Sequence, residues 1–154
     1  MEIENKLKEM GLRLPRIATP VANYIHWVRD GNILYLAGAV GMMDGKLEYV
    51  GKVGKELTIE EGYQSARLCG LNHLASIKDA LGDLDLVDKF IRLVGYVNSA
   101  PGFTEPFKVV NGESDLIVEL YGEERGKHAR AAICVSDLGL DSPVETILTV
   151  RVKG

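Results

Sequence analysis

A long capped helix in the first half of the chain is the feature that most restricts the possible folds. Thr58-Ile-Glu-Glu61 has the pattern of a capping box, in which the threonine oxygen and the Glu61 side chain satisfy free N–H groups of the first turn. Apolar residues then recur at helical spacing as far as Leu81, and Gly82 is a typical C-terminal stop. The apolar face comprises Ile59, Tyr63, Ala66, Gly70, Leu74, Ile77 and Leu81.

Strand patterns lie on both sides of this helix. Two β-rich runs flank Asp30-Gly31, which predicts a hairpin whose type I′ turn has positive φ at both central residues. Asp44-Gly45 indicates a second turn followed by another strand. Residues 90–98 predict a further strand, and Pro106 can begin a second helix that runs to about Gly122.

The order of these patterns predicts the fold class. A hairpin and a strand precede the first long helix, one strand separates the two helices, and two strands close the chain. Two helices in this order cannot cover both faces of the sheet, so we expect an α+β fold with a mixed or largely antiparallel sheet and both helices on one face. Because no linker or repeat interrupts the sequence, residues 1–154 are expected to form a single domain. Apolar residues at helical spacing predict a short helix within an N-terminal extension, residues 1–17.

The predicted strands carry more apolar surface than two helices can bury. We expect this surplus on the second face of the sheet, which no helix covers. A sheet face of this kind needs a partner, and a second copy of the same chain is the simplest source. The pattern therefore predicts a homo-oligomer. The strand residues concerned are Tyr35, Ala37, Leu93, Ile133, Val144, Thr146, Leu148 and Val150.

The charge balance and the cysteine content narrow the classes of partner. The chain has 154 residues with 18 basic and 22 acidic side chains, a net charge of −4, which argues against nucleic acid as the main partner. Its two cysteines, Cys69 and Cys134, form no CxxC pair and have no histidine at metal-ligand spacing, so no metal is expected. The charged N-terminus and the absence of a membrane-length apolar run favour a cytoplasmic protein without membrane contact.

Arg130 and Glu145 are charged residues near the starts of the two closing strands. A guanidinium in a half-buried cleft can bind a planar carboxylate through two parallel hydrogen bonds, and a shielded glutamate can exchange protons or orient water. A structural ion pair between the two side chains is an equally good interpretation. The connecting loop, residues 136–143, is short enough for antiparallel pairing. Spacing alone leaves open whether the two residues meet within one chain or across a subunit boundary.

The remaining polar residues give weaker signals. His26, His73 and His128 fall in a strand, a helix and a loop. Each is interpreted as a packed or surface residue, because no recognisable nucleophile motif accompanies it. Asn111, inside the second helix, could line a pocket or could simply be a poor helix former.

Several short motifs, taken together, resemble one protein family. The matching stretches are Leu36-Ala37-Gly38, residues 61–67, residues 91–97, Val110-Asn111, Ala129-Arg130-Ala131 and Val144-Glu145. They span the chain from about residue 18 to residue 152 and are most specific in its last quarter. In these stretches the chain resembles the reactive-intermediate deaminase A (YjgF) family, also called endoribonuclease L-PSP.

This resemblance implies a fold, an assembly and an activity. The family has a chorismate-mutase-like two-layer α+β fold and forms homotrimers with clefts between subunits. Its better-characterised members hydrolyse enamine or imine intermediates of the 2-aminoacrylate type to 2-keto acids and ammonia, without a metal or cofactor. By resemblance, Arg130 would bind the carboxylate of a small substrate and Gly38 would offer backbone contacts. Glu145 would be the catalytic residue that positions or activates water, and Asn111 would line the pocket.

Two positions depart from the family pattern and bear on the choice of function. Ala132 stands at a substrate-binding position that is usually cysteine, and Val21 stands where a pocket tyrosine is usual, with Tyr24 close by. Imine hydrolysis uses water as its nucleophile, so an enamine or imine deaminase is the first hypothesis. A protein that binds small carboxylates without turnover is the second. An endoribonuclease is the third, because an acidic chain without a basic and aromatic groove offers little to RNA.

Overall fold

The computed structural model describes residues 1–17 and 19–154. Its helices are α1 (Glu2–Glu9), α2 (Ile59–Leu81) and α3 (Pro106–Gly126). The strands are β1 (Trp27–Asp30), β2 (Ile33–Leu36), β3 (Ala39–Val40), β4 (Met42–Met43), β5 (Lys46–Leu47), β6 (Val87–Asn98), β7 (Ala129–Val135) and β8 (Val144–Val152). Two short 3₁₀ helices are η1 (Leu84–Leu86) and η2 (Gly139–Asp141). No helix formed by the described residues is long and apolar enough to cross a membrane.

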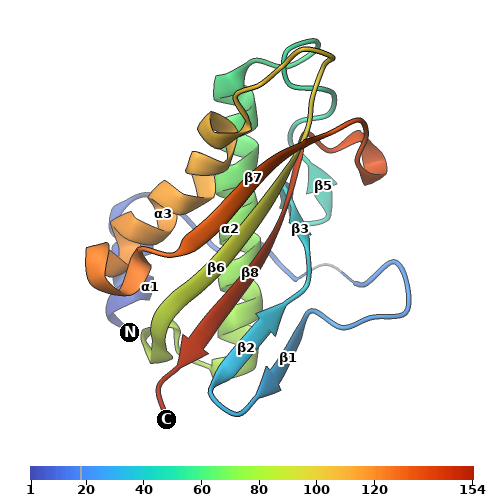
Figure 1. Ribbon diagram of the computed structural model, residues 1–154. Coiled ribbons are helices and arrows are strands. Elements are labelled where there is room, and N and C mark those ends of the chain that lie inside the picture. The colour runs from blue at the N-terminus through green and yellow to red at the C-terminus, as the bar shows by residue number, and fades with distance from the viewer. Residues whose placement is uncertain (18) are drawn as a thin grey trace.

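Most of the strands form one mixed sheet, with α2 and α3 on one of its faces (Figure 1). The strand order is β1-β2-β8-β6-β7, and β3 also pairs with β8. β7 runs parallel to β6, whereas the other neighbouring strands are antiparallel. This arrangement confirms the predicted α+β class, with a mixed sheet and both long helices on one face. The predicted N-terminal helix is also present as α1, which packs against α3 and η1.

Local sequence signals determine the limits of the two long helices. Thr58 accepts a hydrogen bond from the Glu61 N–H at 3.1 Å, and the Glu61 carboxylate accepts one from the Thr58 N–H at 3.0 Å, so the predicted capping box is present. Gly82 ends α2 with φ +78°, a left-handed conformation that glycine adopts at little cost. α3 begins at Pro106, and the non-helical Gly122 interrupts it where the sequence predicted its end.

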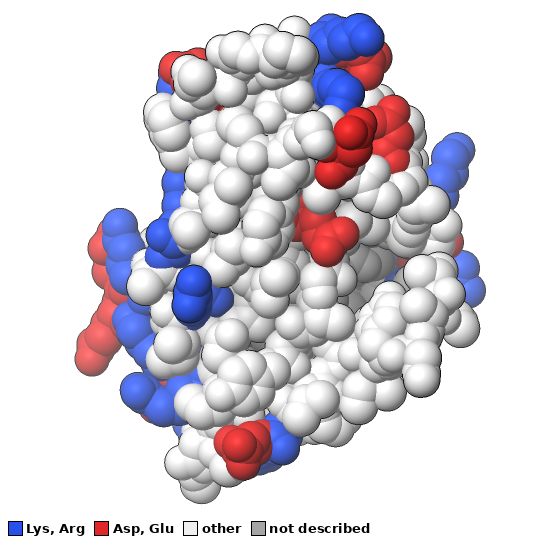
Figure 2. Space-filling model, turned by 45° about the vertical axis from the view of Figure 1, so that its right-hand side comes forward, with Lys and Arg blue, Asp and Glu red and all other residues white. Residues whose placement is uncertain are grey.

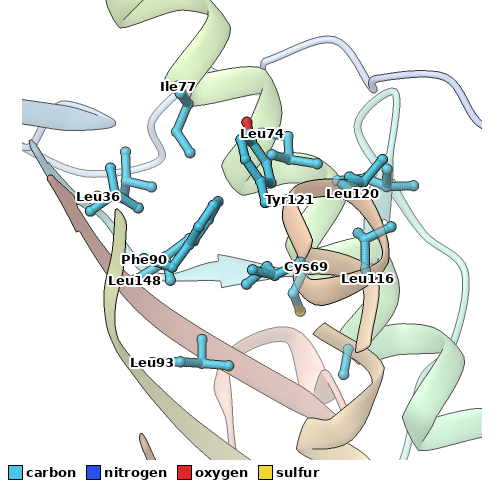
Figure 3. Close-up of a cluster of buried hydrophobic side chains, with 14 of the residues drawn as sticks. Leu36, Cys69, Leu74, Ile77, Phe90, Leu93, Leu116, Leu120, Tyr121 and Leu148 are labelled. Atoms are coloured by element: carbon cyan, nitrogen blue, oxygen red, sulfur yellow. The ribbon is translucent and has the colours of Figure 1, made fainter. Parts of the chain in front are cut away.

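The core lies between the helices and the sheet (Figure 3). Phe90 of β6 packs edge-on against Tyr121 of α3, with ring centroids 4.7 Å apart. Gly112, in the middle of α3, lies so close to α2 that a β-carbon there would be 2.0 Å from the Tyr63 carbonyl oxygen. The close contact between the two helices therefore requires glycine at this position. Other fully buried side chains are Leu74 and Ile77 of α2, Leu116 and Leu120 of α3, Leu93 of β6 and Leu148 of β8.

The two predicted turns differ in type. Asp30 pairs with Ile33, so the β1–β2 loop consists of residues 31–32, one position later than predicted. Within this loop only Gly31 has positive φ, as a type II′ turn requires, and the predicted type I′ turn is therefore wrong there. The Asp44-Gly45 pair has positive φ at both residues and connects β4 to β5, as a type I′ turn does.

β7 and β8 run in opposite directions but do not pair with each other. Both pair with β6, which lies between them. Arg130 is level with Leu93 of β6, and Glu145 is level with Tyr96. The direct pairing that the short loop suggested is therefore wrong, because residues 136–143 pass across the end of β6.

The apolar face predicted for self-association is smaller than expected. Alternate residues of a strand share a face, and in β8 the apolar set points toward the helices. Five of the residues predicted for the open face are instead buried: Leu93, Val144, Thr146, Leu148 and Val150. Ala37 is half-buried. Cross-strand pairing places four exposed apolar residues on the face opposite the helices: Val28, Tyr35, Ile133 and Ile147. The oblique view in Figure 2 shows a largely uncharged surface with a few charged side chains near its middle.

Candidate functional site

A cavity of about 230 Å³ lies beside the bend between β2 and β3. Its walls come from the segment before β1, this bend, the middle of α2, the loop before β8 and the start of β8 itself. Ile17, Met42 and Leu140 contribute apolar surface, and Glu145 contributes a carboxylate. The volume is below the roughly 300–1,000 Å³ of sites for drug-sized ligands, so the cavity suits a small molecule.

Gly38 and Glu145 meet in this cavity. β3 pairs with β8 so that Val40 is level with Glu145, and the bend before β3 brings residue 38 against the carboxylate. A β-carbon on Gly38 would lie 2.6 Å from Glu145 Oε2, so a larger residue would displace the carboxylate. Burial raises the pKa of Glu145, and the positive charge of His73 acts in the opposite direction. A carboxylate whose pKa is raised is a stronger base than an ordinary glutamate.

His73 of α2 lines the same cavity and is fully buried. Its Nδ1 lies 2.6 Å from Glu113 Oε2 of α3, and its Nε2 lies 3.1 Å from the carbonyl oxygen of Ala37. Burial alone would lower the pKa of His73, but the charge and the hydrogen bond of Glu113 raise it above its ordinary value. Of the two interpretations, a packed or a surface residue, the structure shows the packed one for His73, but its contact with Glu113 was missed. Glu113 lies among the apolar core positions of α3, and this was the signal that could have revealed the pair.

The segment before β1 supplies an aromatic wall. Val21 and Tyr24 both line the cavity. The Tyr24 ring lies edge-on to His26, with ring centroids 6.0 Å apart. A tyrosine therefore reaches the cavity even though Val21 stands where the resemblance would place one.

Arg130 lies away from this cavity, on the edge strand β7. Its Nη1 donates to Ser114 Oγ at 3.0 Å and its Nη2 donates to the Phe107 carbonyl oxygen at 3.0 Å. Burial lowers the pKa of Arg130, but a guanidinium remains charged throughout the physiological range. Both contacts come from α3, so this helix fixes the direction of the guanidinium.

Ser114 connects Arg130 to His128. The Ser114 hydroxyl lies 2.9 Å from His128 Nε2, and His128 Nδ1 lies 2.7 Å from the Gly126 carbonyl oxygen. A neutral imidazole satisfies both contacts, with Nδ1–H donating to the carbonyl and Nε2 accepting from the hydroxyl. Burial lowers the pKa of His128 and so favours this neutral form.

Asn111 and Ala132 belong with Arg130 rather than with Glu145. Asn111 is half-buried one turn from both Phe107 and Ser114, on the same side of α3. Ala132 follows Arg130 by two residues on β7 and is level with Gly95 of β6. The structure therefore divides the five predicted site residues into two groups, Gly38 with Glu145 and Arg130 with Asn111 and Ala132.

The two groups lie on different faces of the sheet. Arg130 is level with the buried Leu93 and points toward α3, whereas Glu145 alternates with the buried Val144 and Thr146. Among the residues that the structure describes, no ion pair joins Arg130 to Glu145, so the structural ion pair considered from the sequence is wrong within one chain. Within the same described ranges, no cluster of three His, Cys, Asp or Glu side chains could hold a metal ion.

Comparisons with known sequences match nearly the whole chain. The family described as "YjgF/chorismate_mutase-like, putative endoribonuclease" matches residues 4–149. Protein TCP17 of Trypanosoma cruzi is 41% identical over 147 residues, which cover 96% of this chain and 92% of that protein.

Solved structures show the same fold. A protein with unknown function from Agrobacterium tumefaciens is 38% identical with a TM-score of 0.91, over 99% of this chain and 93% of its own. A "putative endoribonuclease" from Shewanella oneidensis is 33% identical with a TM-score of 0.94, over 99% of this chain and 100% of its own. RidA from an Antarctic Psychrobacter is 18% identical with a TM-score of 0.60, over 89% of this chain and 94% of its own, a likeness in fold alone.

Proposed function

The chain belongs to the YjgF/chorismate mutase-like family, and we propose that it hydrolyses small enamine or imine intermediates of the 2-aminoacrylate type to 2-keto acids and ammonia. The observation that carries this proposal is the half-buried Glu145 carboxylate, which faces a small cavity beside the Gly38 backbone. The Arg130 guanidinium, held by two hydrogen bonds to α3, supports it as a receptor for the substrate carboxylate.

Each complete site would form between two subunits of a homotrimer. Arg130, Asn111 and Ala132 of one subunit would face Gly38 and Glu145 of the next. The exposed apolar residues on the open sheet face support such an assembly, because association would remove them from water. The edge position of β7 also supports it, because one edge of this strand pairs with no other strand among the described residues and is open to a second subunit.

The chemistry would use water as the nucleophile. Arg130 would bind the substrate carboxylate through two parallel hydrogen bonds. Glu145 would accept a proton from a water molecule while the water oxygen bonds to the imine carbon. That proton would pass to the nitrogen, which leaves a carbinolamine with a new hydroxyl group. Transfer of the hydroxyl proton to the nitrogen, again through Glu145, would then form the C=O bond and break the C–N bond, so that ammonia leaves and the 2-keto acid remains. No thiol takes part in these steps, which makes Ala132 compatible with turnover.

A coupled assay tests this proposal. A pyridoxal-phosphate-dependent eliminase generates 2-aminoacrylate in solution, and the decay of the imine is followed with and without the protein. We expect acceleration by the wild-type protein and loss of at least about 100-fold in Arg130→Ala and Glu145→Gln. Lys78→Gln, a surface change on α2, serves as the control and should retain activity. Unaltered activity in both site variants would overturn the proposal.

A small-carboxylate binding protein without turnover is the second candidate. Ala132 supports it, because the position lacks the thiol usual in the deaminases that the chain resembles. Thermal protection by 2-keto acids without any imine hydrolysis would favour this function, and Arg130→Ala should abolish the protection. Ribonuclease activity that survives both Arg130→Ala and extensive purification would instead favour the endoribonuclease.

We place the protein in the cytoplasm, where Cys69 and Cys134 would remain the free thiols that they are here.

A further inference from the structure

His73 and Glu113 form a buried pair that the proposed chemistry does not use. Their exposed fractions are 1% and 0%. A neutral imidazole has one N–H donor and one acceptor nitrogen, but both ring nitrogens of His73 face oxygen atoms, one of Glu113 and one of Ala37. Only the doubly protonated imidazolium donates to both. Glu113 is the counter-charge that makes a buried imidazolium tolerable.

Glu113 extends this network to β8. Its Oε1 accepts a hydrogen bond from Thr146 Oγ1 at 2.5 Å. Thr146 directly follows Glu145, and Ala37 directly precedes Gly38. The network therefore holds Ala37, the neighbour of Gly38, and Thr146, the neighbour of Glu145.

The charge of His73 also acts on Glu145. The charged groups that face His73 are Glu113 of α3 and Glu145 of β8. The nearby Cys69 thiol of α2 is fully buried, and burial raises its pKa, so it adds no charge. Burial of Glu145 favours its protonated form, and the charge of His73 opposes this effect. Without His73, the effect of burial would be unopposed.

We propose that His73 is a positioning residue for the cavity: as an imidazolium paired with Glu113, it fixes the Ala37 carbonyl beside Gly38 and supplies a positive charge to the cavity that Glu145 also lines. The effect on turnover rests on the proposed function. The protonation state of His73 and its influence on Glu145 do not.

The first test uses the unaltered protein. Nitrogen-15 NMR of the imidazole rings distinguishes protonated from unprotonated ring nitrogens, and the chain has 3 histidines to assign. At about pH 7.5, where an ordinary histidine is neutral, we expect both nitrogens of His73 to be protonated. His128, with one carbonyl and one hydroxyl partner, should show one unprotonated nitrogen in the same spectrum. A neutral His73 would overturn the proposal.

The second test measures the titration of Glu145 by carbon-13 NMR of its carboxyl group. In His73→Gln the pKa of Glu145 should rise further, because a nearby positive charge has been removed. Lys78→Gln is the matched control, since it removes a cation of the same helix that pairs with Glu4 and does not line the cavity. An unchanged Glu145 titration in His73→Gln would contradict the proposal. Should that variant fail to fold, the uncharged pair His73→Gln/Glu113→Gln takes its place, with a smaller expected rise because the negative charge of Glu113 is removed as well.

Activity then separates the two proposals. If the protein hydrolyses imines, the acidic limb of its pH profile should move to higher pH in His73→Gln by the same amount as the Glu145 titration. If the protein is active but its pH profile and its Glu145 titration are the same in wild type and His73→Gln, only the proposed role of His73 is overturned. An inactive protein whose Glu145 titration still responds to His73 would overturn the proposed function and leave the positioning role intact.

Discussion

Arg130 and Glu145 lie on strands that flank β6, and they point to opposite faces of the sheet. Arg130 is held by α3 on the helical side, and Glu145 faces the cavity beside Gly38. One chain therefore does not bring the guanidinium to the carboxylate. If both residues act on one substrate, two subunits must contribute to each site.

Subunit mixing tests this arrangement. Arg130→Ala and Glu145→Gln should each be inactive alone, because each lacks one half of every site. When equal amounts of the two variants are unfolded together and reassembled at random, about a quarter of the intersubunit sites should contain both native residues. We expect about a quarter of the wild-type activity in the coupled imine assay.

Each variant reassembled by itself is the control and should stay inactive. Sites that form within one chain would never recover both residues by mixing. The absence of any regained activity in verified mixed oligomers would therefore contradict an intersubunit site that uses Arg130 and Glu145.

Glu145→Gln should stabilise the protein near neutral pH while it removes activity. Burial raises the pKa of Glu145, so the folded state binds a proton more readily than the unfolded state does. The stability associated with this group is present below its ordinary pKa of 4.5 and is lost as the pH rises through the folded-state pKa. At neutral pH the ionised carboxylate is thus unfavourable, and an uncharged amide of similar shape removes this cost.

Thermal unfolding of the wild type and Glu145→Gln at several pH values measures the effect. We expect a modestly higher midpoint for the variant at about pH 7 and a smaller difference at about pH 4, where the wild-type carboxyl is also protonated. The effect is small because Glu145 is only half-buried. A variant that is less stable at neutral pH would show that the carboxylate makes favourable contacts.

The parts of the fold that were predicted correctly depend on neighbours in sequence. The capping box at Thr58, the stop at Gly82 and the start at Pro106 are local signals, and each is where the sequence placed it. The strand order was not predicted, because the pairing of β7 and β8 with β6 depends on contacts between distant segments. The burial of Leu93 and of the alternate β8 residues beneath the helices was missed for the same reason, because it also depends on these pairings.

The candidate site, too, was predicted where the signal is local in sequence and missed where it depends on contacts between distant segments. The motifs identified Arg130 and Glu145 as unusual strand residues, but their opposite directions follow from the register with β6. The pair of His73 and Glu113 joins two helices that are adjacent only in the folded chain. From propensity alone Gly112 only weakens the middle of α3, whereas in the structure it allows the close contact between α3 and α2.

Gly112→Ala should destabilise the fold strongly. The new β-carbon would lie 2.0 Å from the Tyr63 carbonyl oxygen and 3.0 Å from the Ala66 β-carbon, so α2 and α3 would have to separate. Overpacking of this kind costs about 1–3 kcal/mol, and a backbone oxygen leaves little freedom to adjust. Urea unfolding should show a loss at the upper end of this range.

Gly139→Ala is the matched control, because no described atom lies within 4 Å of the position that its β-carbon would take. We expect its unfolding free energy to change by less than about 0.5 kcal/mol. Equal stability of the two variants would mean that the helices are farther apart than the structure places them.

His128 should make stability fall as the solution becomes mildly acidic. Burial lowers the pKa of His128 below its ordinary value of 6.5, so the unfolded chain binds a proton more readily than the folded one. Stability therefore rises with pH between the folded-state pKa and 6.5, and it is lost as the pH falls through this window. Protonation would also place a hydrogen on His128 Nε2, which could then no longer accept the hydrogen bond from the Ser114 hydroxyl.

Urea unfolding at about pH 7.5 and about pH 5.5 measures this contribution when wild type is compared with His128→Gln. His73 has the opposite dependence, because its raised pKa gives stability below 6.5 that is lost as the pH rises through its folded-state value. Because His73 is present in both proteins, its contribution to the pH dependence of stability cancels in the comparison. The wild type should lose more stability than the variant on acidification, by well under about 1.4 kcal/mol per pH unit, the limit for one proton, because His128 is partly exposed. A parallel loss in both proteins would mean that His128 is not held in its neutral form.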